Sequence, residues 1–252
     1  MTGPRRLRYN VARPPTTRGT RHPDVAELTY FYGTMNCGKS TLALQIHHNA
    51  VTAGKHCLLF TKHDRGGGRI TSRIGLSQDA VVVTDSFDIA THVQAVTAAG
   101  TPVDVVICDE TQFYTAQQVE QLAWLVDELD VEVQAFGLLT DFTTHLFAGS
   151  KRLLELADRR QELQVEARCW CGERGTSNAR TVDGAIQRQG QQVVVGDLPQ
   201  ASLETGEVPT VAYEVLCRRH HRQGITRVLA DRQPDRARER TMFPVAGSAA
   251  TR

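Results

Sequence analysis

The hydrophobic residues of this chain form short apolar runs that alternate with stripes of helical period. The apolar runs have the length of buried strands and occupy residues 28–32, 56–61, 81–83, 103–108 and 131–136. Between them, apolar residues recur every three or four positions over residues 42–50, 87–96 and 119–129. Strands that alternate with helices in this way predict an α/β fold, in which a parallel sheet carries helices on both faces.

Changes in this pattern divide the chain into four segments. Residues 1–26 contain Pro and Arg without apolar periodicity, which predicts a flexible N-terminal extension. Residues 27–158 hold the alternating strands and helices. Residues 159–224 change to short alternating segments and turns, typical of a small β module. Residues 225–252 are rich in Arg and predict a basic C-terminal tail.

The first strand is followed by the sequence G-x-x-x-x-G-K-S, which is typical of a phosphate-binding loop. Its residues are Gly33, Thr34, Met35, Asn36, Cys37, Gly38, Lys39 and Ser40. The two glycines allow backbone N–H groups to turn inward around phosphate oxygens. The Lys39 amine is expected to reach the β and γ phosphates of ATP, and the Ser40 hydroxyl to bind Mg²⁺. Cys37 is a variable position of the motif and receives no role of its own. The alternative is a glycine-rich turn that only precedes a helix.

Two carboxylates, Asp109 and Glu110, follow the apolar run 103–108. Ligands of parallel sheets bind at the carboxyl ends of the strands, so both side chains are expected beside the phosphates. Asp109 has the position of a carboxylate that holds Mg²⁺, and Glu110 suits a general base. An Asp-Glu pair in this place is also common as a helix cap.

The segment 62–73 is glycine-rich and basic, and it includes Arg65. It predicts a mobile loop that closes over phosphates, with Arg65 as a phosphate ligand. An ordinary surface loop is the alternative.

The small β module contains two pairs of soft metal ligands. The four residues are Cys169, Cys171, Cys217 and His220. Three thiolates and one imidazole suit a tetrahedral Zn²⁺ ion. The alternative is that these residues share a module by chance, although a short β segment with few large apolar residues needs a staple.

Charge and composition limit the possible functions. The net charge of +1 combines six Arg against two acids in residues 1–27, nine Arg against three acids in residues 218–252, and a body that carries −9. An acidic body does not attract polyphosphate through its overall field, so the loop, Lys39 and the metal must hold it locally. The sequence has no apolar run of about 18 residues and no apolar signal-peptide core near its beginning. We therefore expect a cytoplasmic protein without membrane contact.

Five motifs occur in an order that resembles cytosolic, type II thymidine kinases. They lie at residues 30–41, 72–77, 109–113, 137–142 and 217–220, and the resemblance covers about residues 28–223. It implies a P-loop nucleotide-binding domain at 27–158 and a zinc-stapled lasso at 159–224 that closes over the nucleoside. It also implies a homotetramer with feedback binding of thymidine triphosphate.

The same resemblance implies roles for individual residues. Glu110 would accept the proton of the thymidine 5′-hydroxyl, and residues 109–112, with Thr111 and Gln112, would hold the ATP side. The residues expected to bind the nucleoside are Met35, Phe113, Phe142, Phe147, Val194, Gly196 and Tyr213.

The function expected from the sequence is transfer of the ATP γ-phosphoryl group to thymidine, and also to deoxyuridine, without nucleic acid as a partner. A nucleic-acid-stimulated P-loop ATPase with a zinc module is the alternative, in which Glu110 activates water and the basic ends hold DNA. A regulatory nucleotide-binding protein without turnover is a third possibility.

Overall fold

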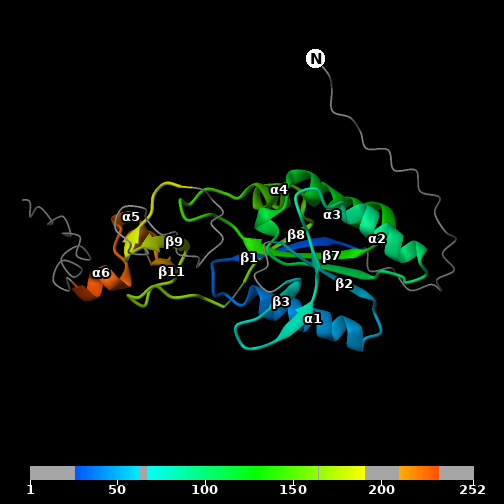
Figure 1. Ribbon diagram of the computed structural model, residues 1–252, viewed down its shortest axis with the longest axis horizontal. Helices are drawn as coiled ribbons and strands as arrows, with labels where there is room; N and C mark the ends of the chain where they lie inside the picture. Colours follow the sequence, from blue (N-terminus) through cyan, green and yellow to red (C-terminus); the bar gives the residue numbers. More distant parts are fainter. Residues whose placement is uncertain (1–25, 63–66, 164, 191–209, 233–252) are drawn as a thin grey trace, which may run out of the picture.

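A six-stranded parallel sheet forms the centre of the protein, seen in a computed structural model that describes residues 26–62, 67–163, 165–190 and 210–232 (Figure 1). The strand order is β5-β2-β6-β7-β1-β8, and every neighbouring pair is parallel. The strands are β1 (Leu28–Gly33), β2 (Cys57–Thr61), β5 (Val81–Val82), β6 (Val105–Cys108), β7 (Glu132–Leu138) and β8 (Arg159–Glu162). The parallel α/β class predicted from the sequence is therefore confirmed.

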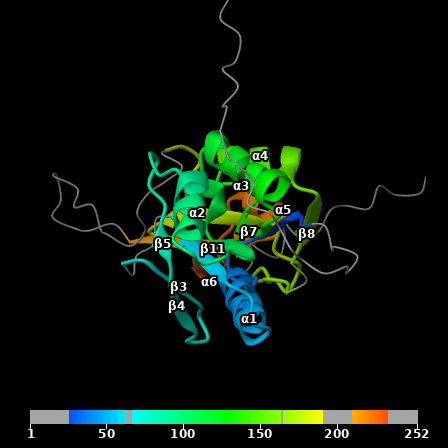
Figure 2. The same cartoon turned by 90° about the vertical axis from the view of Figure 1, so that its right-hand side faces the viewer.

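Helices cover both faces of this sheet (Figure 2). One face carries α2 (Ile89–Ala98), α3 (Ala116–Leu129) and α4 (Ala148–Leu156), and the other carries α1 (Lys39–Thr52) with the hairpin of β3 (Arg69–Thr71) and β4 (Ser77–Asp79). Each face has its own hydrophobic cluster, with Leu122 and Leu125 central on the α3 side and Ala43 and Phe136 on the α1 side. The two clusters explain why the central strands are apolar at successive positions rather than at alternate ones.

Local sequence determines where these helices begin. Thr115 and Gln118 form a reciprocal capping box at the start of α3, which satisfies backbone donors that the first helical turn leaves open. The Asp88 side chain caps α2 by accepting a hydrogen bond from the Thr91 N–H. Helix α1 begins after Gly38, whose φ of 83° is left-handed and favours glycine.

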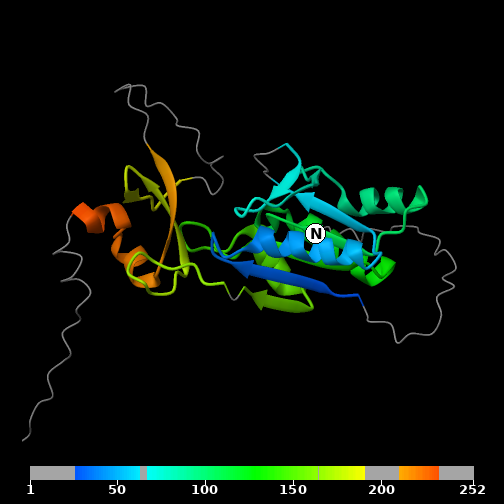
Figure 3. The ribbon, with the colours of Figure 1, turned by 90° about the horizontal axis from the view of Figure 1, so that it is seen from below.

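A second unit lies at the carboxyl end of the parallel sheet, and we call its described residues, 165–190 and 210–232, the Cys/His module (Figures 1 and 3). Its antiparallel sheet has the order β10-β9-β11. Its elements are β9 (Ser177–Val182), β10 (Ala185–Ile186), β11 (Val211–Leu216), α5 (Arg218–Gln223) and α6 (Arg227–Arg232). The short strands and turns expected for this region are confirmed.

Two predicted boundaries are wrong. Strand β8 pairs with β1, so the parallel sheet extends to Glu162 rather than ending before residue 159. All four β8 residues are exposed, so this edge strand has no hydrophobic pattern that could reveal it. The sequence predicts a basic tail from residue 225 onwards, but residues 227–232 form α6, and Ile225, Thr226 and Ala230 are buried.

None of the helices in the described part of the chain is long and apolar enough to cross a membrane.

The packing of residues 225–232 gives a prediction about truncation. Trp170 Nε1 donates to the Ile225 carbonyl, and the Thr226 hydroxyl donates to the Gly184 carbonyl. Removing a buried Ile and two hydrogen bonds costs about 3 kcal/mol. A chain that ends at Gly224 should therefore unfold at a lower urea concentration than a chain that ends at Arg232. Equal urea midpoints for the two chains would show that α6 does not stabilise the module.

Candidate functional site

The phosphate loop joins β1 to α1 and has the tight geometry that its glycines allow. A Cβ atom added at Gly33 would lie 2.5 Å from the Cys37 Sγ, so a larger residue at this position would force the Cys37 side chain to move. Lys39 is 9% exposed, and its Nζ donates to the Thr34 carbonyl at 2.7 Å. The Lys39 amine is therefore held against the loop itself, where it can meet an anion bound by the backbone N–H groups.

The loop is joined directly to the carboxylate that follows β6. The Ser40 hydroxyl donates to Asp109 Oδ2 at 2.7 Å, and Asp109 is 4% exposed. Asp109 Oδ1 accepts the backbone N–H of Glu110 at 2.9 Å. A hydroxyl and a carboxylate in contact supply the hard oxygen donors that Mg²⁺ prefers, so these residues fit that ion.

Glu110 lies next to this pair in a strained backbone conformation. Its φ of 57° and ψ of 34° are left-handed, which costs about 1–3 kcal/mol for a residue other than glycine. Such outliers persist where the surrounding structure holds them, and they cluster at functional sites. Gln112 Nε2 donates to Glu110 Oε2 at 2.5 Å.

Thr111 and Gln112 belong to the short 3-10 helix η1 (Thr111–Phe113) and are both buried. The Thr111 hydroxyl donates to the Phe136 carbonyl, and Gln112 Oε1 accepts the Leu138 N–H. These side-chain contacts are with β7 and Glu110, not with the phosphate loop.

Aromatic side chains gather beyond the carboxyl ends of β6 and β7. Phe113 and Phe147 meet edge to face, with 5.5 Å between their ring centroids. The Arg180 guanidinium lies over the Phe142 ring at 3.9 Å. The three phenylalanines expected to bind the nucleoside therefore each make a ring contact in this region.

Tyr213 of β11 is paired with Arg180 of β9. Directly opposed residues of an antiparallel pair project to the same side of the sheet, so Tyr213 shares a face with Arg180. Tyr213 also lines an open hollow of about 300 Å³, together with Asn36 of the phosphate loop and Trp170. Asn178, two positions before Arg180 on β9, accepts the Met35 N–H, so this face of the antiparallel sheet meets the phosphate loop.

The four predicted metal ligands converge. The ligand atoms of Cys169, Cys171, Cys217 and His220 all lie within 4.8 Å of one another, and the cysteines are not in disulfides. His220 Nδ1 is 3.4 Å from the Cys169 Sγ and 3.5 Å from the Cys217 Sγ. Burial raises the pKa of the Cys169 thiol to about 12, so a cation that binds there must displace a proton. Three sulfurs and one nitrogen at this spacing fit a tetrahedral ion such as Zn²⁺.

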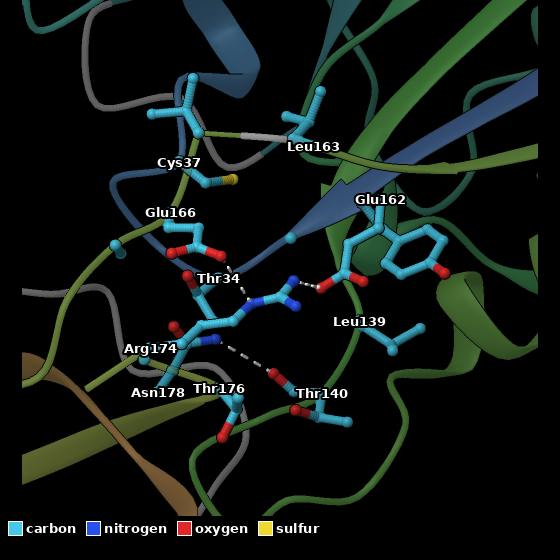
Figure 4. Close-up of a pocket in the computed structure, with 15 residues that line it drawn as sticks. Thr34, Cys37, Leu139, Thr140, Glu162, Leu163, Glu166, Arg174, Thr176 and Asn178 are labelled. Atoms are coloured by element: carbon cyan, nitrogen blue, oxygen red, sulfur yellow. Dashed lines mark hydrogen bonds and ion pairs between the residues drawn. The ribbon is translucent and has the colours of Figure 1, made fainter.

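A cavity of about 130 Å³ lies where the phosphate loop, β8 and the Cys/His module meet (Figure 4). Arg174 bridges Glu162 and Glu166 on its wall, and the Asn178 amide donates to the Thr140 carbonyl. Neither Asp109 nor Glu110 lines this cavity.

Three predicted site residues, Arg65, Val194 and Gly196, lie outside the described residues. The expected N-terminal extension up to residue 25 and the tail from residue 233 onwards lie outside them as well.

Comparison with known proteins identifies the family. The thymidine kinase family model matches residues 26–221. This chain belongs to the thymidine kinase family. It is 55% identical over 205 residues to a curated thymidine kinase of Streptomyces coelicolor, covering 81% of this chain and 92% of that protein. A curated thymidine kinase of Cutibacterium acnes is 52% identical over 203 residues, covering 80% and 91%. The resemblance stated from the five motifs is therefore confirmed.

Three residues of this thymidine kinase chain join the Cys/His module to the site and were missed from the sequence. Asn178 Oδ1 accepts the Met35 N–H at 2.8 Å, Arg180 stacks on Phe142, and His221 Nε2 donates to the Phe142 carbonyl at 3.0 Å. Asn178 and Arg180 are two positions apart on β9, so a period of two predicts a shared face. Nothing local to these residues indicates which loop that face meets.

Proposed function

We propose that this protein transfers the γ-phosphoryl group of ATP to the 5′-hydroxyl of thymidine, and of deoxyuridine, to give the nucleoside monophosphate in pyrimidine salvage. The observation that carries this proposal is the hydrogen-bonded series Ser40–Asp109–Glu110 beside a phosphate loop, in a chain of the thymidine kinase family.

ATP is expected to bind with its phosphates on the loop 33–40. The backbone N–H groups and the Lys39 amine neutralise the β and γ phosphates. Ser40 and Asp109 would hold Mg²⁺, which supplies charge neutralisation to the transferring group when bound. The protein then contributes mainly by positioning the donor and acceptor.

Thymidine is expected to bind between the two protein units. Met35, Phe113, Phe142, Phe147 and Tyr213 would surround the base, and the contacts inferred above between β9 and these residues support that location. Val194 and Gly196 stay predictions from the resemblance, and Arg65 stays a prediction from the glycine-rich, basic segment 62–73.

Glu110 is the residue that we assign as general base. A 5′-hydroxyl is a poor nucleophile until its proton has an acceptor, and a carboxylate next to the metal ligand can receive it without being needed for the metal. The strained backbone of Glu110 supports a functional role, because it aims this side chain differently from that of Asp109.

The remaining assignments extend the family resemblance. Zn²⁺ would occupy the four-residue cluster and staple the two ends of the lasso. A homotetramer, feedback binding of thymidine triphosphate and a cytoplasmic location complete the proposal.

A nucleoside panel tests the proposed function. ADP formation from Mg-ATP should depend on thymidine or deoxyuridine and should be indifferent to added DNA. ADP formation stimulated by DNA without nucleoside would favour the ATPase, and binding of ATP without ADP formation would favour a regulatory protein.

The two carboxylates should respond differently to removal of charge. Glu110→Gln should lower kcat by about 10²- to 10⁴-fold, with little change in binding of thymidine and Mg-ATP, because only proton acceptance is lost. Asp109→Asn should instead change the Mg²⁺ requirement together with turnover. Steady-state kinetics over a Mg²⁺ titration separates the two variants, and near wild-type turnover by Glu110→Gln would remove Glu110 as the base.

The metal cluster should stabilise the nucleoside side of the site. Cys171→Ser is expected to lose Zn²⁺ and to weaken thymidine binding more than ATP binding, because metal binding and folding of the joined loops are coupled. Cys57→Ser is the matched control, since Cys57 lies on β2 outside the cluster. Metal analysis and thymidine titration check this, and a zinc-free Cys171→Ser protein with normal thymidine affinity would contradict it.

A further inference from the structure

Both halves of the Gln112 side-chain amide are engaged within the protein. Its Nε2 donates to Glu110 Oε2 at 2.5 Å, and its Oε1 accepts the Leu138 N–H at 3.0 Å. Gln112 is 1% exposed. A contact between this amide and ATP would require the buried side chain to be uncovered, and turning the amide towards a ligand would strain these two hydrogen bonds, which is costly.

The turn that carries Gln112 is tightly packed against two glycines. A Cβ atom at Gly137 would lie 2.9 Å from Gln112 Oε1, and a Cβ atom at Gly149 would lie 2.3 Å from the Thr111 carbonyl oxygen and 3.0 Å from the Gln112 carbonyl oxygen. Real Cβ atoms do not make contacts under 3.0 Å, so β7 and α4 approach η1 as closely as backbone allows.

Leu138, which donates its N–H to Gln112 Oε1, is itself fixed by further hydrogen bonds. The Leu138 carbonyl accepts hydrogen bonds from the Tyr30 hydroxyl at 3.1 Å and from the Ser150 hydroxyl at 2.5 Å. Leu138 is therefore fixed through both its N–H and its carbonyl. An amide bonded to such a residue has little freedom to rotate.

A fixed amide donor does two things to a carboxylate. It sets the rotation of the carboxylate group, and it favours the ionised form that a base requires. We propose that Gln112 is the positioning residue that holds the Glu110 carboxylate for proton acceptance, rather than a ligand of ATP. This proposal rests on the assignment of Glu110 as the general base.

A double-mutant cycle tests the proposal through its non-additivity. Gln112→Glu keeps an oxygen for the Leu138 N–H but puts a second carboxyl group beside Glu110 in place of the neutral amide donor, and Gln112→Met loses both contacts. In the wild-type background each change should lower kcat by about 10- to 100-fold, with KM for thymidine and for ATP within about twofold, because a hydrogen bond to a charged group is lost. In the Glu110→Gln background the same changes should lower kcat by less than about twofold, because residues that act as a unit are non-additive.

Gln121→Glu is the matched control. Gln121 is also buried, and its Oε1 accepts the Ile89 N–H at 3.0 Å, as Gln112 Oε1 accepts the Leu138 N–H. It lies in α3, so its change should leave kcat within about twofold in both backgrounds. Thermal unfolding of every variant shows whether a lower kcat results from unfolded protein.

The outcomes are distinguishable. Equal losses of kcat for Gln112→Glu in the two backgrounds, with Glu110→Gln itself slow, would overturn this proposal and leave the base assignment intact. A raised KM for ATP with unchanged kcat would indicate that Gln112 binds ATP and would also overturn this proposal. Wild-type turnover by Glu110→Gln would overturn the base assignment, and this proposal with it.

Discussion

The packing of residues 110–113 against Gly137 and Gly149 is the constraint on which the site depends. It leaves no room for a Cβ atom at Gly137 of β7 or Gly149 of α4. Glu110, which precedes η1, has a left-handed backbone conformation. Asp109 continues the direction of β6 and meets Ser40, whereas Glu110 is turned away to meet Gln112. Two adjacent carboxylates can therefore serve a metal and a proton separately, because the backbone between them bends sharply.

A second set of contacts joins the Cys/His module to the phosphate loop and to the segment that contains Phe142. Strand β9 reaches the phosphate loop through Asn178 and reaches the Phe142 segment through Arg180, and His221 of α5 supports the same segment. Because α5 also carries His220, a metal ion in the cluster would act on the His221 contact through one short helix. The Cys/His module is thus connected to the phosphate loop and to Phe142 by two hydrogen bonds and a cation–π contact.

Much of this arrangement could be predicted from the sequence because it is local. The strands and helices follow from apolar periodicity, and the phosphate loop and the Asp109-Glu110 pair follow from their places after strands. The exposed edge strand β8 was not predicted, since it carries no apolar pattern. Residues 225–232 were not predicted either, because their apolar residues span barely two helical turns at the start of an Arg-rich segment. The contacts of Asn178 with Met35, of Arg180 with Phe142 and of Gln112 with Leu138 depend on which chain segments meet in space, and no spacing along one sequence encodes that.

The distance between the Glu110 carboxylate and the thymidine 5′-oxygen tests the central claim most directly. It can be measured in a crystal structure of the protein with thymidine, Mg²⁺ and a non-hydrolysable ATP analogue. The account predicts a carboxylate oxygen within hydrogen-bond reach of the 5′-oxygen, at about 2.6–3.2 Å. A 5′-hydroxyl that points away from Glu110 and is bonded to another acidic group would contradict it.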